Sequence, residues 1–393
     1  MSGKLRVLSI STLYPNDHTP NFGVFVERQM QAVMRRGDVD LTLINPIGLP
    51  PFPLSLHPRY APLRGVARQE QRGGVAVLRP RFTLLPMIGA RFNAGAIVRA
   101  VLPLARRMHA EQPFDLVDAQ FFHPDGAAAV RIGAALGLPV SIKARGADIH
   151  HWGKHPATAA QVLDAGLKAK GLLAVAGGIA DDMAELGMPR GKITIHRTGL
   201  DRSIFKPHDK AEARARLGLP ADKPLLACVG ALIPRKGQVY AIEALALMPE
   251  GELLLAGTGE DEMMLRARAA ELGVAERVRF LGAVPHGELP WLLSAADVFV
   301  LPTASEGLAN AWVEALACGT PIVTTPIPGA VELLTDPAWG RLAARDKLAI
   351  AIAVDEILSE PPPRAEVLRG AAPFSWEANA AGLVEYWRGL VGR

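Results

Sequence analysis

Two glutamates eight residues apart, Glu306 and Glu314, flank the start of a predicted helix. An apolar run at 298–301 precedes them and a second at 321–324 follows, so the pattern predicts strand, loop, helix and strand. Loop amides and the N-terminus of such a helix form an anion site. Because two acids beside it would repel phosphate, we interpret them as partners of neutral hydroxyl groups. The stretch therefore predicts a ligand with sugars on both sides of a diphosphate.

The helix of this stretch is predicted over about 311–318. Asn310 stands where an N-cap side chain would accept a hydrogen bond from the first turn. Gly319 follows the last helical residues and suits the left-handed conformation that often ends a helix. Strand, loop and helix start would then direct their amides to one point.

Two adjacent cations, Arg235 and Lys236, follow the apolar strand predicted at 225–229. Cations at the carboxyl end of a strand suit a diphosphate. Exposed Arg-Lys pairs are usually only solvated. This pair gains weight because its strand belongs to the same predicted sheet as the strand at 298–301.

Polar residues also follow two predicted strands in the first half of the chain. His123 comes after the strand at 116–119, and Arg145 and Asp148 come after the strand at 140–143. A single histidine is more often a structural hydrogen-bonding group than a catalyst. Its position at the carboxyl end of a strand, where ligands bind in parallel sheets, favours a functional role.

Several other motifs fail their structural context. Gly257 and Gly259 form a Gly-x-Gly after a strand, but acids at 260–262 follow in place of the third glycine of a dinucleotide site. Asp38 and Asp40 would lie at the amino end of a strand, the wrong end for a ligand. Phosphate-loop, zinc and Gly-x-Ser-x-Gly spacings are missing from the sequence. No metal site is therefore predicted.

Composition indicates a globular protein, with 393 residues, 49% of them apolar and 21% charged. Cys228 and Cys318 stand in apolar surroundings and are expected to be reduced core residues. No apolar stretch reaches the roughly 18 residues that a membrane span needs. The N-terminus leads directly into a strand, so no signal peptide is expected.

Charge is unevenly distributed along the chain. Residues 1–200 hold 24 Lys and Arg against 14 Asp and Glu, a net +10, and residues 201–393 hold 19 against 25, a net −6. This asymmetry suggests an acidic partner for the first half, although a solvated basic surface would also explain it. The segment 84–108 is predicted as a basic amphipathic helix. It would either lie on a membrane surface or pack on the core with its arginines in water.

Strands and helices alternate in two series, which predicts an α/β protein with two parallel-sheet domains. Residues 198–223 are polar and contain two prolines, so they are a candidate interdomain linker. A proline cluster at 361–363 precedes a final helix at 375–390. We therefore expect an N-terminal domain of residues 1–200 with 376–393 and a C-terminal domain of residues 201–375.

The stretch from Glu306 to Val323 resembles the Glu-x7-Glu signature of the retaining glycosyltransferases of family 4, which have the GT-B fold. That fold comprises two Rossmann-like domains facing a central cleft. Four further segments resemble motifs of the same family, in the same order along nearly the whole chain: 198–207, 229–237, 279–282 and 296–298.

The resemblance implies roles for the matching residues of the second domain. Glu306 would bind hydroxyls of the transferred sugar, and Glu314 would bind the ribose of the nucleotide. Arg235 and Lys236 would neutralise the leaving diphosphate. Loop and helix-start amides would contact the sugar and diphosphate; they belong to Gly307, Leu308, Ala309 and Asn310.

The resemblance also implies roles in the first domain. His123 matches the histidine that contacts the donor sugar near its reacting carbon. Gly23 matches a glycine loop where donor and acceptor approach the backbone, and Arg145 and Asp148 would lie on the acceptor side. The sequence departs from the family at Ala231, where a phosphate-binding arginine is usual, and Arg235 is its candidate substitute.

The activity implied is transfer of a sugar, of the hexosyl type, from a nucleoside-diphosphate sugar to an acceptor hydroxyl with retention of configuration. Attack would occur from the front face, with the leaving phosphate taking the acceptor's proton. No cofactor is expected and a metal is not required. An epimerase or phosphorylase on the same fold, and a catalytically idle carbohydrate-binding or scaffold protein, remain alternatives.

The implied partners are a nucleotide-sugar donor and a saccharide or lipid-linked saccharide acceptor. Such a reaction belongs to polysaccharide or glycolipid assembly. The basic N-terminal half adds an anionic membrane surface, and nucleic acid is not expected. We therefore expect a cytoplasmic protein, peripheral at the inner face of the membrane.

Overall fold

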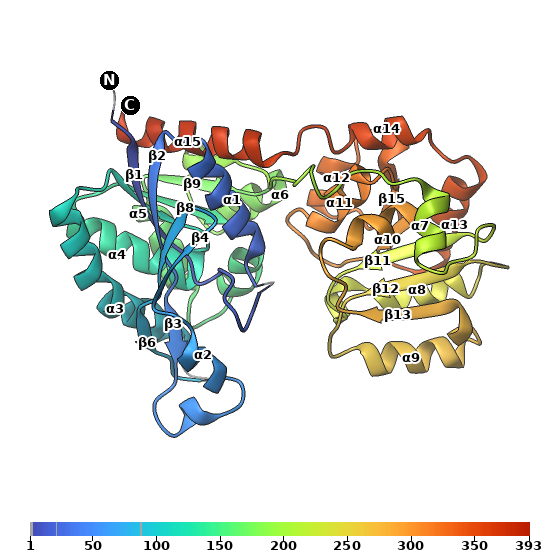
Figure 1. The fold of residues 1–393 in the computed structure, drawn as a ribbon, viewed down its shortest axis with the longest axis horizontal. Helices are drawn as coiled ribbons and strands as arrows, with labels where there is room; N and C mark the ends of the chain where they lie inside the picture. The colour runs from blue at the N-terminus through green and yellow to red at the C-terminus, as the bar shows by residue number, and fades with distance from the viewer. Residues whose placement is uncertain (1–2, 21, 87–88) are drawn as a thin grey trace. The chain divides into compact units, whose positions relative to one another are not determined.

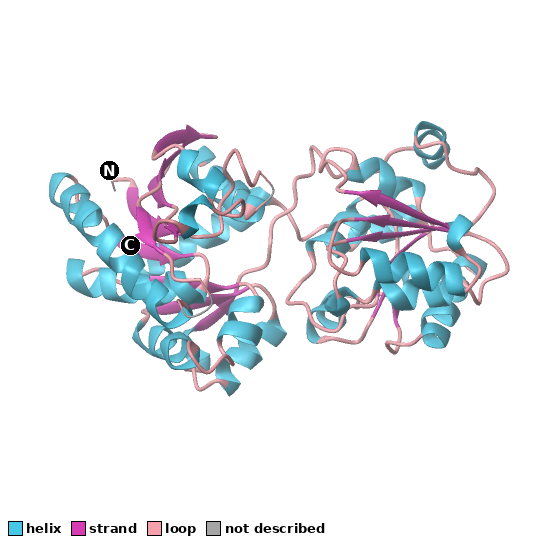
Figure 2. Ribbon diagram, turned by 90° about the horizontal axis from the view of Figure 1, so that it is seen from below, coloured by secondary structure: helices cyan, strands magenta, loops and turns pink. Residues whose placement is uncertain are grey.

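The computed structural model describes residues 3–20, 22–86 and 89–393 (Figure 1). The chain forms two compact units: unit 1 is Met1–Gly199 with Trp376–Arg393, and unit 2 is Leu200–Ser375. The boundary expected after residue 200 lies one residue from this division, and the boundary expected before residue 376 has the same position. Each unit has a sheet between layers of helices (Figure 2).

Unit 1 is built on an eight-stranded sheet of order β10-β9-β8-β7-β1-β2-β5-β4. All neighbours are parallel except β4, which runs antiparallel to β5 at the edge. The strands are β1 (Leu5–Ile10), β2 (Val39–Ile44), β4 (Gln69–Arg72), β5 (Val75–Leu78), β7 (Leu116–Ala119), β8 (Val140–Ala144), β9 (Gly171–Ala174) and β10 (Ile193–Ile195). A separate parallel pair joins β3 (Ile47–Leu49) to β6 (Arg81–Thr83).

Helices of unit 1 cover both faces of this sheet, whereas the short α2 contacts the separate strand β3 (Figure 1). The helices are α1 (Val24–Arg35), α2 (Ala61–Gly65), α3 (Ala90–Glu111), α4 (Ala127–Leu136), α5 (Ala159–Lys168), α6 (Gly177–Glu185) and α15 (Trp376–Val391). Although α15 is last in the sequence, it packs beside α1. Its Trp387 is fully buried, and the indole nitrogen donates to the Asp118 carboxylate at 3.2 Å. The C-terminal helix is therefore part of the core of unit 1.

The segment 84–108 forms α3, which begins later and ends later than expected. Its buried face carries Ala94, Ile97, Val101 and Ala105. The arginines lie on the exposed side, so the helix packs on the core, and contact of its exposed side with a membrane stays a prediction. Met87 and Ile88, part of the predicted segment, lie outside the described residues. No helix in the described part of the chain is long and apolar enough to cross a membrane.

Unit 2 has a six-stranded parallel sheet of order β13-β12-β11-β14-β15-β16. Its strands are β11 (Leu225–Val229), β12 (Glu252–Ala256), β13 (Val278–Gly282), β14 (Val298–Leu301), β15 (Ile322–Thr324) and β16 (Gly340–Leu342). Its helices are α7 (Lys210–Arg216), α8 (Gln238–Leu245), α9 (Glu262–Glu271), α10 (Leu289–Ala295), α11 (Asn310–Ala317), α12 (Pro328–Leu333), α13 (Lys347–Ser359) and α14 (Arg364–Arg369). Both cysteines are free and buried in its core, as expected.

The expected linker at 198–223 is wrong over most of its length, because residues 200–223 belong to unit 2. Phe205 is buried in the core of that unit. The Arg214 guanidinium is also buried and pairs with Asp297 at 2.6 Å. A polar composition therefore hid a segment that is fixed by burial and by an ion pair.

Replacing Trp387 by phenylalanine should destabilise unit 1 through one lost hydrogen bond to the buried Asp118. Trp376→Phe is the matched control on the same helix, because its buried indole nitrogen has no partner among the described residues. We expect Trp387→Phe to lower the free energy of unfolding by about 1–3 kcal/mol more than Trp376→Phe does. Urea unfolding measures both, and equal losses would contradict the assignment.

Candidate active site

The helix α11 begins where the chain leaves the loop after β14. The prediction of Asn310 as N-cap is wrong: Asn310 is the first helical residue, and Ala309, with φ −71° and ψ 122°, is the cap. No side chain caps this end, so the first-turn amides have no side-chain oxygen bonded to them. The other end is as predicted, since Gly319 has φ 79° and its amide donates to Leu316.

Glu306 lies at the centre of the candidate site. One oxygen of its carboxylate, Oε1, is 2.5 Å from Arg235 Nη1 and 2.5 Å from Lys236 Nζ. The side chains of Glu306 and Lys236 are only 14% and 15% exposed, whereas that of Arg235 is 44% exposed. The structure thus brings together three residues that the sequence placed on two separate loops. Two cations share one carboxylate, which leaves this cluster with a net positive charge.

Adjacent parallel strands explain this meeting. β11 pairs with β14, so the loops that follow them leave the same edge of the sheet. Arg345 then ties the loops together, because its guanidinium donates to Pro302 O at 2.9 Å and to Pro234 O at 2.7 Å. Arg345 was not predicted: it comes from a distant segment, and no local motif marks it. With its guanidinium bound to these carbonyls, it braces the loops and does not stand in for the arginine absent at Ala231.

The Gly-x-Gly after β12 allows its loop to pack against the loop after β11. Gly257 has φ 148°, and a Cβ there would lie 1.9 Å from Gly230 O. A Cβ on Gly259 would lie 2.1 Å from Leu232 O. The loop after β12 therefore presses against the loop that leads from Ala231 to the two cations.

Glu314 lies in α11, and its side chain is 13% exposed. His286 Nε2 lies 3.4 Å from its Oε1. The His286 ring also packs edge-on against Phe205, with ring centroids 4.7 Å apart. His286 was not predicted, although it follows β13 at the same sheet edge, and that location could have indicated it.

His123 in unit 1 is a buried imidazole, 1% exposed, after β7. Neither ring nitrogen makes a hydrogen bond within the described residues, although the Ala90 backbone lies nearby. Burial lowers the pKa of His123 to about 4, so the ring is neutral at pH 7. A buried polar group without a partner is unusual and indicates a functional position.

Asp148 holds the turn that carries His123. Its carboxylate accepts hydrogen bonds from the amides of Phe122 at 3.0 Å and Arg145 at 2.9 Å. The side chain is fully buried, and burial raises its pKa. These contacts give Asp148 a positioning role, and a contact with the acceptor stays a prediction.

Arg145 is held by a network that the sequence did not reveal. Its Nε donates to Gln120 O at 2.9 Å, and its Nη2 donates to Gln29 Oε1 at 2.9 Å. Gln29 in turn donates to Asn379 Oδ1 of α15 at 2.9 Å. Burial lowers the pKa of Arg145 to about 10, so it keeps its charge at pH 7. These partners are distant in sequence, and only the fold brings them together.

Gly23 precedes α1 with φ 78°. A Cβ at this position would lie 2.4 Å from the carbonyl carbon of Leu13. Glycine is therefore required where the start of α1 crosses the loop after β1. Within residues 3–20, 22–86 and 89–393, no three His, Cys, Asp or Glu side chains are grouped so that they could hold a metal ion.

Two α/β units, each built on a mainly parallel sheet with helices on both sides, have the architecture of the GT-B fold. The family model for group 1 glycosyl transferases matches residues 209–372, and the model for glycosyltransferase family 4 matches residues 58–203. The chain belongs to glycosyltransferase family 4. It is 34% identical over 218 residues to the D-inositol 3-phosphate glycosyltransferase of Mycobacterium tuberculosis H37Rv. The match covers 52% of this chain. The match spans about half, 45%, of the length of that curated relative.

Solved structures share the fold over nearly the whole chain. Sucrose-phosphate synthase from Thermosynechococcus elongatus has a TM-score of 0.79 at 21% identity and covers 99% of this chain and 100% of its own. Anabaena Alr3699/HepE in complex with UDP has a TM-score of 0.76 at 18% identity, with 98% and 100% coverage. The same protein in complex with UDP-glucose has a TM-score of 0.74 at 19% identity, again with 98% and 100% coverage.

Gly257→Ala should displace the loop after β11, which carries Arg235 and Lys236, because the added Cβ would clash with Gly230 O. Gly273→Ala is the matched control, because Gly273 also has a positive φ, 70°, but a Cβ there meets nothing within 4 Å. We expect Gly273→Ala to cost about 1–2 kcal/mol of stability, and Gly257→Ala about 1–3 kcal/mol more. Gly257→Ala should also weaken nucleoside diphosphate binding. Urea unfolding and calorimetry measure these effects, and equal behaviour of the variants would refute the packing role.

Proposed function

We propose that this protein is a retaining glycosyltransferase that transfers a hexosyl unit from a nucleoside-diphosphate sugar to an acceptor hydroxyl. The observation that carries the proposal is the cluster of Arg235, Lys236 and Glu306 at the carboxyl ends of β11 and β14. The HepE structures with UDP and UDP-glucose, which share the fold, support a nucleotide-sugar donor. Assembly of a polysaccharide or glycolipid is the setting that we propose.

The donor would change the partners within this cluster. A diphosphate carries more negative charge than one carboxylate, so it would compete with Glu306 for Arg235 and Lys236. The uncapped amides at the start of α11 would add a partial positive charge. Glu306 would then be released to accept hydrogen bonds from the sugar hydroxyls, and Glu314 would accept those of the ribose.

Transfer would depend mainly on positioning and charge stabilisation. Arg235, Lys236 and the α11 amides would stabilise the departing diphosphate, with no metal required. The leaving phosphate oxygen would take the proton of the acceptor hydroxyl as it attacks from the same face. The neutral His123 has free ring nitrogens that suit a hydrogen bond with a sugar hydroxyl. Arg145 would lie on the acceptor side.

The acceptor that we propose is a saccharide or lipid-linked saccharide at the cytoplasmic face of a membrane. The net charge of +10 over residues 1–200 supports an anionic surface as partner of unit 1. A thermal-shift screen of nucleoside diphosphates and sugar nucleotides would identify the donor, because a ligand of the folded state raises its apparent stability.

Incubation of that donor with and without candidate acceptors then tests the class of reaction. A glycosidic product that forms only with acceptor supports glycosyl transfer. Conversion of the donor alone would indicate an epimerase. A lack of reaction across the whole donor panel would indicate an idle binding protein.

Lys236→Ala should lower turnover by about 10²–10³-fold, because the leaving diphosphate loses a largely buried cation. Lys223→Ala is the matched control: Lys223 is exposed and precedes β11, at the opposite edge of the same sheet. Steady-state kinetics with the identified donor measures both variants. If Lys236→Ala turned over at nearly the wild-type rate, Lys236 would not stabilise the leaving diphosphate.

Glu306→Ala should separate donor binding from transfer. Removal of this carboxylate deprives Lys236 and Arg235 of their shared partner, so nucleoside diphosphate affinity should hold or rise. Transfer should fall, because the sugar hydroxyls lose their acceptor. Calorimetry with the nucleoside diphosphate and a transfer assay provide the two measurements. Unchanged transfer would remove Glu306 from the sugar site, and weaker diphosphate binding would refute the competition.

A further inference from the structure

The stretch 41–110 has an unusual charge composition. It contains ten arginines, no lysine and a single acid, Glu70. Only Arg72 and Arg79 pair with a carboxylate among the described residues. The other eight are Arg59, Arg64, Arg68, Arg81, Arg91, Arg99, Arg106 and Arg107. This part of unit 1 therefore has a positive charge that the protein itself leaves unbalanced.

An exposed apolar tip lies within the same stretch. Between β3 and α2 the chain forms a loop, beside α2 in Figure 1, that contains a short helical turn, η1 (Leu54–Leu56). Phe52 is 79% exposed, Leu54 is 54% exposed and Leu56 is 51% exposed. Neighbouring apolar side chains that are exposed to solvent commonly mark an interaction site. Arg59 and Arg64 follow within ten residues of the tip and are also exposed.

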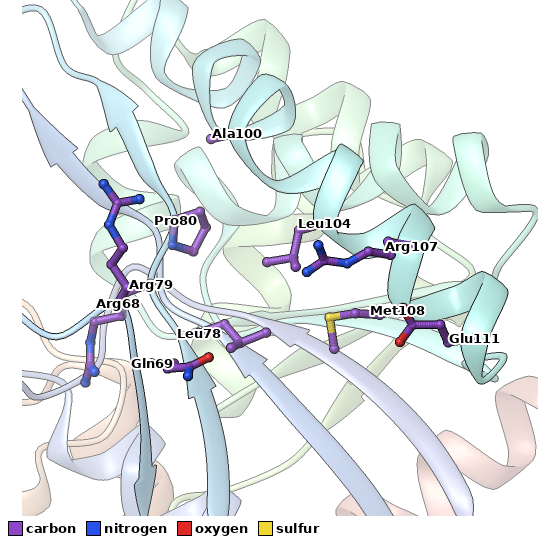
Figure 3. Close-up of a pocket in the computed structure, with 10 residues that line it drawn as sticks. All are labelled: Arg68, Gln69, Leu78, Arg79, Pro80, Ala100, Leu104, Arg107, Met108 and Glu111. Atoms are coloured by element: carbon purple, nitrogen blue, oxygen red, sulfur yellow. The ribbon is translucent and has the colours of Figure 1, made fainter.

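Residues that follow the tip in the sequence line a groove of about 670 Å³. It lies between α3 and the edge strands β4 and β5 (Figure 3). Leu78, Leu104 and Met108 form its apolar part, and Figure 3 shows Arg107 extending from α3 over it. Arg68 lies at one end of the groove and Glu111 at the other. The groove therefore offers arginine donors beside an apolar surface.

The electrostatics around the groove favour an anion. Burial lowers the pKa of Arg81, and the neighbouring cations Arg68 and Arg79 lower it further. The charge of Arg79 is balanced by Glu70, 2.6 Å away. The groove is separate from the candidate active site, since β1 and β2 lie between β5 and the strands that lead to His123 and Arg145.

We propose that the stretch 41–110 of unit 1 docks on an anionic phospholipid membrane. The tip with Phe52 and Leu54 inserts into the boundary between head groups and acyl chains, and the groove takes one lipid phosphate between Arg68 and Arg107. An apolar tip gains free energy from burial in lipid, and each nearby arginine is attracted to the negative surface. Arginine binds phosphate through its planar fork, which suits a head group. This inference rests on the membrane partner proposed above, but not on glycosyl transfer.

Insertion of the tip is tested with tryptophan reporters. Phe52→Trp should be quenched by vesicles of phosphatidylglycerol with brominated acyl chains. Met263→Trp is the matched control, because Met263 is 84% exposed but lies on α9 of unit 2. The double variant Phe52→Ser with Leu54→Ser should reduce flotation with these vesicles by about tenfold or more. Equal quenching of both reporters, or unchanged flotation of the double variant, would overturn the insertion.

The groove is tested with two arginines that are neighbours in sequence. Arg107 lines the groove and Arg106 does not, yet both are exposed on α3. Reversal of either charge changes the net charge equally, so diffuse attraction would weaken both variants to the same extent. We expect Arg107→Glu to bind vesicles about fivefold more weakly than Arg106→Glu. Equal affinities would overturn the head-group site and leave only a diffuse basic surface.

Two further binding experiments identify the source of the phosphate. They also separate the membrane-docking proposal from the glycosyl-transfer proposal. Monomeric short-chain phosphatidylglycerol should bind wild type and should bind Arg107→Glu more weakly. Binding of inorganic phosphate with the same affinity as this lipid would overturn the lipid assignment. Failure of wild type to float with anionic vesicles would remove the membrane partner and this docking surface together. Nucleoside diphosphate thermal shifts on the same samples would still report the donor site, so glycosyl transfer is judged separately.

Discussion

The candidate active site depends on one carboxylate oxygen that is shared by two cations. Glu306 Oε1 holds Arg235 and Lys236 at the same distance, 2.5 Å. This geometry exists only because β11 and β14 are adjacent and parallel, so that both loops leave one sheet edge. A single negative charge cannot balance two positive charges, and Lys236 is too buried to rely on water alone. The cluster therefore keeps a net positive charge that a diphosphate would neutralise.

The surroundings of this site limit how far its loops can move. Arg345 bonds to carbonyls of both loops, and Gly257 allows the loop after β12 to press on the loop after β11. In unit 1, Asp148 does the same for the turn of His123 through backbone amides. Each of these supports fixes a backbone whose amides or side chains would contact the proposed substrates. Such positioning is the main contribution that a glycosyl-transfer site of this kind can make.

The parts that local sequence determines could be predicted, and the parts that depend on distant contacts could not. The strand, loop and helix between 298 and 324 were predicted because apolar runs and Gly319 mark them within one short window. The N-cap at Asn310 was wrong by one residue, since cap geometry depends on backbone angles that residue preference does not fix. The Gln29–Asn379 bond joins residues 350 apart, and Arg345 acts on loops more than 40 residues away. Only the topology of the sheets brings such partners together.

Arginine has two different uses in this chain, and the presence of a carboxylate partner distinguishes them. In unit 2, Arg235 lies against Glu306, so its charge is directed to one point and is available to a ligand that outcompetes that acid. In the stretch 41–110, eight arginines have no carboxylate partner among the described residues, and their charge is spread over a surface. A small ligand with two phosphates suits the first arrangement. The second needs a partner that is itself extended and anionic, and the exposed Phe52 beside it requires that this partner also offer an apolar layer. A bilayer meets both requirements, whereas a soluble polyanion meets only one.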